Sequence, residues 1–107
     1  MPRQNSISPF DPYNPRRQFR REDLPAPLTY YPGEDVKLFG RGIWRSARCV
    51  FHCDHNPSLR VNVQTGAFKC MSCGAHGGDV LDFHRKRYGM GFVTAAKDLG
   101  AWTGAAQ

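Results

Sequence analysis

Apolar and polar side chains alternate strictly between residues 59 and 63. A period of two is typical of a strand that buries one face. Turn-forming residues follow at 64–66, and residues 67–70 return to a strand-like composition. The pattern therefore predicts a β-hairpin. Two further short strands are predicted at 36–38 and 43–48, where β-forming residues lie on either side of a glycine-rich turn.

Helical periodicity begins after the glycine-rich segment 74–78, which is expected to be a flexible loop. The apolar face of this helix would carry Val80, Phe83, His84 and Tyr88. Asp79 precedes the run and can accept a hydrogen bond from a free N–H of the first turn. Glycines at 89 and 91 end the helix. A second helix is predicted from Phe92 to Leu99, stopping at Gly100.

Proline usage divides the chain of 107 residues into two parts. Seven of the eight prolines lie in the first 33 residues. Each proline removes a backbone donor and restricts the preceding residue, so such a stretch disfavours helix and sheet interiors. The sequence predicts a disordered arm rich in proline and arginine over residues 1–33 and one domain over residues 34–107. That domain is expected to be a small α+β fold with an antiparallel sheet flanked by helices.

Positive charge is concentrated in the part of the domain that holds the cysteines. The whole chain has a net charge of +6, and six basic side chains between residues 36 and 73 are opposed by one acid, Asp54. The basic residues are Lys37, Arg41, Arg45, Arg48, Arg60 and Lys69. This excess indicates a polyanionic partner. The alternative is a solvated basic face that only keeps a small protein soluble.

Four potential metal ligands form two pairs, each with two residues between its members. The pairs are Cys49 with His52 and Cys70 with Cys73, and 17 residues separate them. Thiolates and imidazole at this spacing are typical of one tetrahedral Zn²⁺. Four protein ligands leave no open position, so the zinc is expected to be structural and to stabilise a small core. Cys53, next to His52, remains an alternative ligand.

The same cysteines would suit a secreted disulfide scaffold, but the first residues carry no signal-peptide pattern. No segment approaches the roughly 18 consecutive apolar residues that a membrane helix needs. The sequence therefore favours a reducing, cytoplasmic location and no membrane partner.

Two segments carry the pattern of a known family. Residues 49–59 and 68–79 resemble the zinc-binding domain of bacterial DNA primases, which has a Cys-x-x-His pair, a Pro-Ser turn, a strand, and a Cys-x-x-Cys-Gly sequence before a helix. The resemblance covers about residues 35–101. It implies a zinc ribbon in which Cys49, His52, Cys70 and Cys73 bind the metal. Val50 departs from the family, which has proline there, and His55 stands where the family commonly has lysine.

The resemblance also implies a function in primer synthesis for DNA replication, with the sheet contacting single-stranded template DNA. The basic and aromatic positions then become the expected contacts, which are Arg41, Trp44, Arg45, Arg48, His55, Arg60 and Lys69. Trp44 or Phe68 would provide a surface for base stacking, unless the ring packs in the core.

Nothing in the chain suits nucleotidyl transfer. That reaction needs clustered carboxylates that hold divalent ions, and after Cys73 the only acids are Asp79, Asp82 and Asp98. A phosphate-binding loop pattern is also missing. We therefore expect a DNA-binding zinc finger related to DNA primase, without catalytic residues, that works with a primase catalytic domain or a replicative helicase. The alternative is an adaptor that docks on a replication polymerase or helicase.

Overall fold

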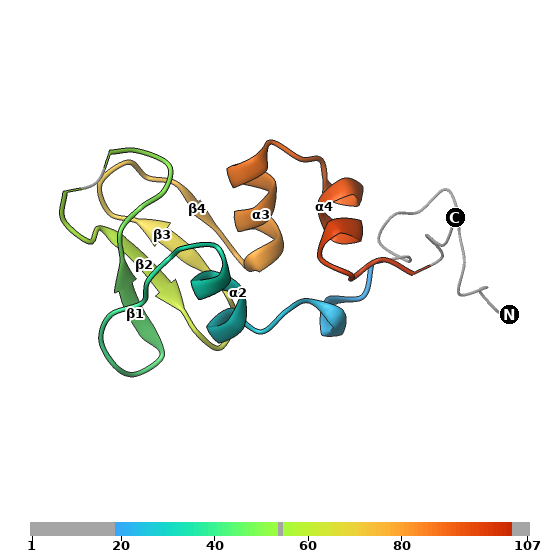
Figure 1. Cartoon of the computed structure of the whole chain (residues 1–107), viewed down its shortest axis with the longest axis horizontal. Helices are drawn as coiled ribbons and strands as arrows, with labels where there is room; N and C mark the ends of the chain where they lie inside the picture. Colours follow the sequence, from blue (N-terminus) through green and yellow to red (C-terminus); the bar gives the residue numbers. More distant parts are fainter. Residues whose placement is uncertain (1–18, 54, 104–107) are drawn as a thin grey trace, which may run out of the picture.

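A computed structural model describes residues 19–53 and 55–103 of the chain. Four strands form one antiparallel sheet in the order β1-β2-β3-β4 (Figure 1). The elements are the 3-10 helix η1 (Arg21–Asp23), α2 (Pro27–Gly33), β1 (Trp44–Ala47), β2 (Leu59–Asn62), β3 (Phe68–Cys70), β4 (His76–Gly77), α3 (Val80–Tyr88) and α4 (Phe92–Asp98). The predicted small α+β fold with an antiparallel sheet and flanking helices is confirmed.

The predicted hairpin corresponds to β2 and β3. Leu59 and Val61 are buried, as the alternation indicates, and the Asn62 carboxamide oxygen accepts bonds from the backbone N–H groups of the turn. The strand predicted at 43–48 is the shorter β1. Residues 36–38 form no strand, and the next residue, Phe39, pairs with Ser46 of β1 through an isolated bridge.

The segment predicted as a flexible loop at 74–78 contains the short strand β4. Gly77 lies against the ring of Phe68 on β3, and a Cβ at this position would come within 2.5 Å of Phe68 Cε1. The missing side chain therefore lets the chain approach the sheet edge closely enough to pair. This close approach is a tertiary effect that periodicity does not reveal.

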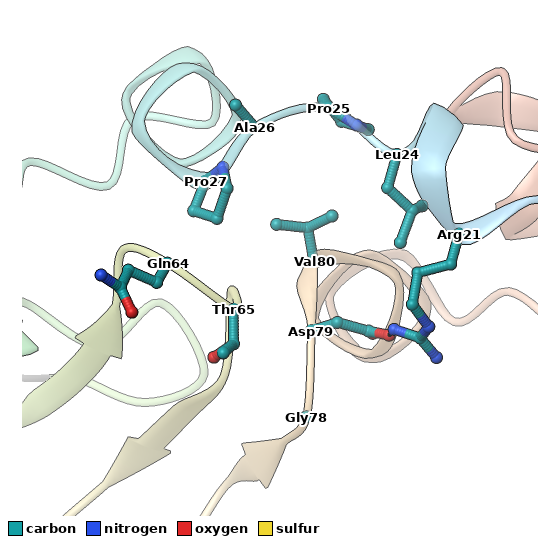
Figure 2. Close-up of a pocket in the computed structure, with 10 residues that line it drawn as sticks. All are labelled: Arg21, Leu24, Pro25, Ala26, Pro27, Gln64, Thr65, Gly78, Asp79 and Val80. Carbon is teal, nitrogen blue, oxygen red and sulfur yellow. Dashed lines mark hydrogen bonds and ion pairs between the residues drawn. The ribbon is translucent and has the colours of Figure 1, made fainter. Parts of the chain in front are cut away.

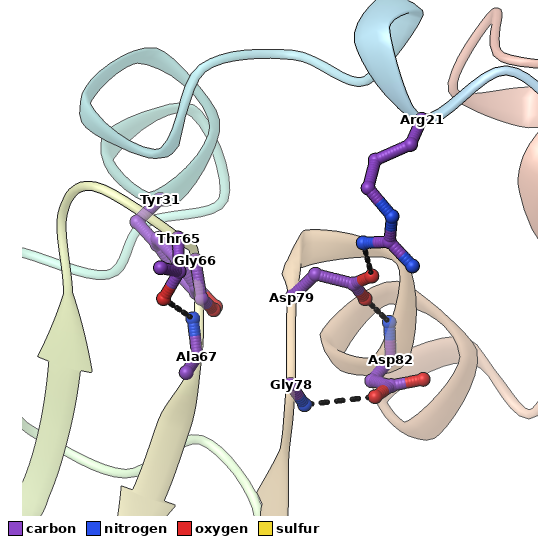
Figure 3. A network of polar contacts seen from close by, with 8 residues as sticks. All are labelled: Arg21, Tyr31, Thr65, Gly66, Ala67, Gly78, Asp79 and Asp82. Atoms are coloured by element: carbon purple, nitrogen blue, oxygen red, sulfur yellow. Dashed lines mark hydrogen bonds and ion pairs between the residues drawn. The ribbon is translucent and has the colours of Figure 1, made fainter.

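Both predicted C-terminal helices are present. Asp79 is the N-cap of α3 and accepts a 2.9 Å bond from the N–H of Asp82 (Figure 3). Gly89 ends α3 in the left-handed conformation with a φ of 65°. α4 lies on the side of α3 away from the sheet (Figure 1).

The prediction of a disordered arm over residues 1–33 does not hold for residues 19–33, and residues 1–18 lie outside the described chain. Pro27 is tolerated because it occupies the first turn of α2, where its missing N–H needs no helical partner. Tyr30 and Tyr31 are buried against the sheet and α3, and this burial outweighs the weak helix propensity of the segment.

α2 ends in a Schellman motif. The N–H of Val36 donates to the carbonyl of Tyr31 at 2.9 Å, and the N–H of Asp35 donates to Pro32 at 3.1 Å. Asp35 has a φ of 64° and is the only non-glycine residue with a positive φ among those described. Glycine usually occupies this position because it has no side chain to strain.

The segment between η1 and α2 is separated from the β2–β3 turn and from the start of α3. A hollow of about 400 Å³ lies between this segment, the β2–β3 turn and the start of α3 (Figure 2). Arg21 forms an ion pair with Asp79 on one side of the hollow. The Arg21 ion pair and the buried tyrosines of α2 hold the two ends of this segment, and Leu24 between them packs against the core.

Aromatic rings form the centre of the core. Phe83 is fully buried, and its ring lies 4.9 Å from Tyr31, 5.1 Å from Phe68 and 5.2 Å from Phe51, centroid to centroid. His84 is a packing histidine, as the helix pattern indicates. Its Nδ1 bonds the Tyr30 hydroxyl at 2.7 Å and its Nε2 bonds Asp98 of α4. The histidine thus links α2, α3 and α4.

Replacing Gly66 by alanine is expected to destabilise the domain by about 1–3 kcal/mol. Gly66 has a φ of 86°, and a Cβ there would lie 2.9 Å from the backbone nitrogen of Val80. Its carbonyl also accepts a 2.6 Å bond from Tyr31, whose hydroxyl stays protonated because burial raises its pKa. Urea unfolding of the zinc-loaded protein measures the loss.

The matched control is Gly33→Ala at the end of α2, because a Cβ there meets no atom within 4 Å and the φ is not positive. That variant should unfold at the wild-type urea concentration or slightly above it. Equal stability of the Gly66 and Gly33 variants would contradict the packing of the β2–β3 turn against α3.

Candidate functional site

Four side chains from two turns meet at one end of the sheet. Cys49 and His52 follow β1, whereas Cys70 ends β3 and Cys73 lies in the turn after it. One ligand atom from each lies within 4.8 Å of all the others. The Cys49 and Cys73 sulfurs are 3.8 Å apart, which matches the edge of a tetrahedron with zinc–sulfur bonds of about 2.3 Å.

Backbone N–H groups point at the sulfurs, as expected for thiolates. Phe51 N donates to the Cys49 sulfur at 3.4 Å, while Ser72 N and Cys73 N donate to the Cys70 sulfur at 3.4 and 3.3 Å. The four cysteines, all in the described part of the chain, form no disulfide. The Cys-His-Cys-Cys group is thus positioned for one zinc ion, and its donor atoms are those that zinc prefers.

The thiols differ in their tendency to ionise. Burial raises the pKa of Cys49. Burial also raises the pKa of Cys70, but the N–H groups of Cys73 and Ser72 outweigh it and hold that pKa below its ordinary value. Thiolates at such short distances repel one another, and a divalent cation would offset this repulsion. Four protein donors would complete its coordination, so the ion would support the fold.

Cys53, the alternative ligand, lies outside this group. Its side chain is exposed, and its sulfur is 3.9 Å from Nε2 of His55. The ring of His52 brings Nδ1 to 3.9 Å from the Cys70 sulfur instead.

The outward face of the sheet gathers basic side chains in one row. The register places Ser46 opposite Arg60, Arg60 opposite Lys69, and Lys69 opposite His76, so the row crosses all four strands. Directly paired residues share a face. The side chains of Arg60, Lys69 and His76 are exposed. Trp44, two residues before Ser46 on β1, lies on the same face. We call these five residues the outer row.

Three of the predicted contact residues belong to the outer row, and four do not. Trp44 is 49% exposed, so this ring does not pack in the core, whereas Phe68 is 2% exposed and does. Arg45 pairs with Val61 on the other face, and its Nε donates to the carbonyl of Gly42. The remaining three lie off the strands: Arg41 in the loop before β1, Arg48 directly after β1, and His55 beside Cys53.

Ser46 and His76 lie in the outer row, and Phe39 lies beside it, although none of the three was among the predicted contacts. Phe39 and Ser46 exchange two backbone hydrogen bonds of 2.7 and 2.9 Å, so Phe39 adds a position to the outer row beyond β1. Its ring is 43% exposed. Only the pairing of this segment with β1 reveals the position, since the predicted strand ended at Leu38.

Comparisons with known proteins agree with this geometry. The model of the CHC2 zinc finger family matches residues 32–106. The DNA primase of Geobacillus stearothermophilus is 39% identical over 72 residues, or 67% of this chain, and that of Mycoplasma pneumoniae is 45% identical over 69 residues, or 64% of this chain. These segments make up 12% and 11% of the two relatives, so the chain spans only a small part of their length.

A solved structure has the same fold. The Aquifex aeolicus primase, crystallised as its zinc-binding and RNA polymerase domains, superposes with a TM-score of 0.62 at 30% identity, over 76% of this chain and 19% of that one. Among the described residues, none of the helices has the length and apolar character needed to cross a bilayer. The family match, the relatives and the ligand group agree, and the chain belongs to the CHC2 zinc finger family, the zinc ribbon of DnaG-type primases.

Proposed function

We propose that this chain is a primase-type module that binds single-stranded template DNA on the outer row during primer synthesis for replication. The observation that carries the proposal is the placement of Arg60 and Lys69 directly opposite one another on exposed positions of β2 and β3. Like charges at such a cross-strand pair destabilise a sheet. A phosphate backbone lying across the strands would relieve that repulsion.

The charge around this pair supports a polyanion rather than a general solubilising surface. The four strands contain no acidic residue at all. The row continues to His76, whose Nδ1 lies 3.0 Å from the carbonyl of Gly74 and whose Nε2 is left to face solvent or a ligand. Acids and bases intersperse on a surface that serves solubility alone.

Trp44 offers a surface on which a base can stack, which contacts to phosphates do not provide. An exposed aromatic ring beside a basic track is the usual combination in proteins that bind single strands, since every base has a π-face on which to stack. A duplex would not offer its bases in this way. The half-exposed indole therefore favours single-stranded nucleic acid as the ligand.

We assign the formation of the phosphodiester bonds of the primer to a partner of this module. The zinc group has four protein donors, and the acids of the described chain are dispersed, with Asp79 and Asp98 engaged by Arg21 and His84. We propose a primase catalytic domain or a replicative helicase as the partner and the bacterial cytoplasm as the location, in line with the bacterial primases that the chain resembles.

Replacing the central pair by glutamine, Arg60→Gln with Lys69→Gln, is expected to weaken binding of a fluorescent dT12 oligonucleotide. The slope of log K against log salt should become shallower by about 1.4, because each phosphate neutralised on a single strand contributes about 0.7. Fluorescence anisotropy of the zinc-loaded protein over a salt titration measures both quantities.

Lys97→Gln on α4 is the control, since it removes an exposed positive charge away from the sheet. It should leave the slope within error of the wild type. The proposal would be contradicted if log K of the wild-type protein did not depend on log salt, or if the Lys97 variant lost as much affinity as the double variant. Retention of a protein partner after nuclease digestion, with no oligonucleotide binding by the pure protein, would favour the adaptor instead.

A further inference from the structure

A hollow of about 280 Å³ lies at the β1 edge of the sheet. Its lining residues are Asp35, Lys37, Phe39 and Arg48. Phe39 joins it to the outer row, because its backbone pairs with Ser46. The hollow is thus continuous with the surface on which we place the template.

The charged side chains that line the hollow do not pair with one another. Among residues 19–53 and 55–103, the side chains of Asp35, Lys37 and Arg48 form no ion pair or hydrogen bond. The Lys37 ammonium lies 5.5 Å from the centroid of the Phe39 ring, which leaves part of the ring accessible. One carboxylate, two cations and one aromatic ring therefore face a common space without neutralising one another.

The backbone of Asp35 adds a second observation. This residue occupies the left-handed position of the Schellman motif, where glycine is least costly. A side chain is less favourable there than glycine. Asp35 therefore places a carboxylate at the edge of the hollow in a position that glycine usually occupies.

We propose that this hollow holds one unstacked nucleotide of the template strand, and this inference rests on the proposed binding of single-stranded DNA. The base stacks on Phe39, the adjacent phosphates lie against Lys37 and Arg48, and the Asp35 carboxylate accepts hydrogen bonds from the base edge. A carboxylate accepts only, so it selects bases that donate. Guanine presents an imino and an amino N–H side by side and satisfies both carboxylate oxygens, which makes guanine the preferred base.

The test uses dT12 oligonucleotides in which one central nucleotide is guanine, adenine, cytosine or an abasic site. Anisotropy of the zinc-loaded wild-type protein should show the guanine oligonucleotide bound at least about fivefold more tightly than dT12 or the abasic one. In Asp35→Asn this preference should fall to within about twofold, since the amide replaces one acceptor by a donor. Phe39→Leu should reduce the advantage of every base over the abasic site.

Both variants should fold, because asparagine readily adopts the left-handed conformation and Phe39 is exposed. Zinc content and circular dichroism are the measurements that check the folding of both variants. Glu22→Gln on η1 controls for the loss of one negative charge and should keep the guanine preference. Equal wild-type affinity for all oligonucleotides, or a preference that survives in Asp35→Asn, would overturn the nucleotide site while salt-dependent binding to dT12 leaves the proposed function intact. Failure to bind any oligonucleotide would overturn both.

Discussion

Removing zinc from this protein is expected to unfold it. Structural zinc contributes roughly 10–16 kcal/mol in zinc-finger peptides, whereas a whole domain is stable by only about 5–15 kcal/mol. The ligand turns also hold β1, β2 and β3 together at one end, so their release frees that end of the sheet. Circular dichroism during thermal unfolding should show a cooperative transition for the zinc-loaded protein and none after chelation. The double variant Cys70→Ser/Cys73→Ser should behave like the chelated protein even with added zinc.

Cys53→Ser provides the matched control, since that thiol is exposed and lies outside the ligand group. It should retain one zinc per chain and the wild-type unfolding temperature. A chelated protein that unfolds cooperatively at the wild-type temperature would refute a structural metal. Loss of zinc in Cys53→Ser would instead show that Cys53, and not His52, is the fourth zinc ligand.

Phe83→Ala is expected to destabilise the zinc-loaded domain by about 3–5 kcal/mol. The ring is fully buried where α2, α3 and the sheet meet, so its loss leaves a cavity among Tyr31, Phe51 and Phe68. Phe51 lies between the ligands Cys49 and His52, and the variant should therefore also lose zinc faster to a competing chelator. Urea unfolding and the rate of zinc transfer to a colorimetric chelator measure the two effects.

Leu28→Ala on α2 is the corresponding control, because Leu28 is 52% exposed. Its stability should stay within about 0.5 kcal/mol of the wild type. A loss below about 1 kcal/mol in Phe83→Ala would mean that the aromatic centre does not govern stability. An unchanged rate of zinc transfer would mean that packing around Phe83 does not affect how tightly the Cys49–His52 turn holds the metal.

Local sequence rules predicted those elements whose structure depends on near neighbours. The cap at Asp79, the stop at Gly89 and the alternation in β2 each involve side chains and backbone groups a few residues apart. Such interactions are specified wherever the pattern occurs. The same rules failed for α2, because proline content argues against a helix unless a buried partner is known. Tyr30 and Tyr31 find that partner in α3, about 50 residues away.

The sequence by itself determined the metal chemistry and the family, since two pairs of ligands at fixed spacing constrain the chain wherever it folds. Only the tertiary structure decided which basic and aromatic residues share a surface. Strand register set Arg60 against Lys69 and turned Arg45 to the opposite face. The bridge between Phe39 and Ser46 then brought Asp35, Lys37 and Arg48 around one hollow. Register and edge pairing depend on contacts between distant segments, which no local pattern records.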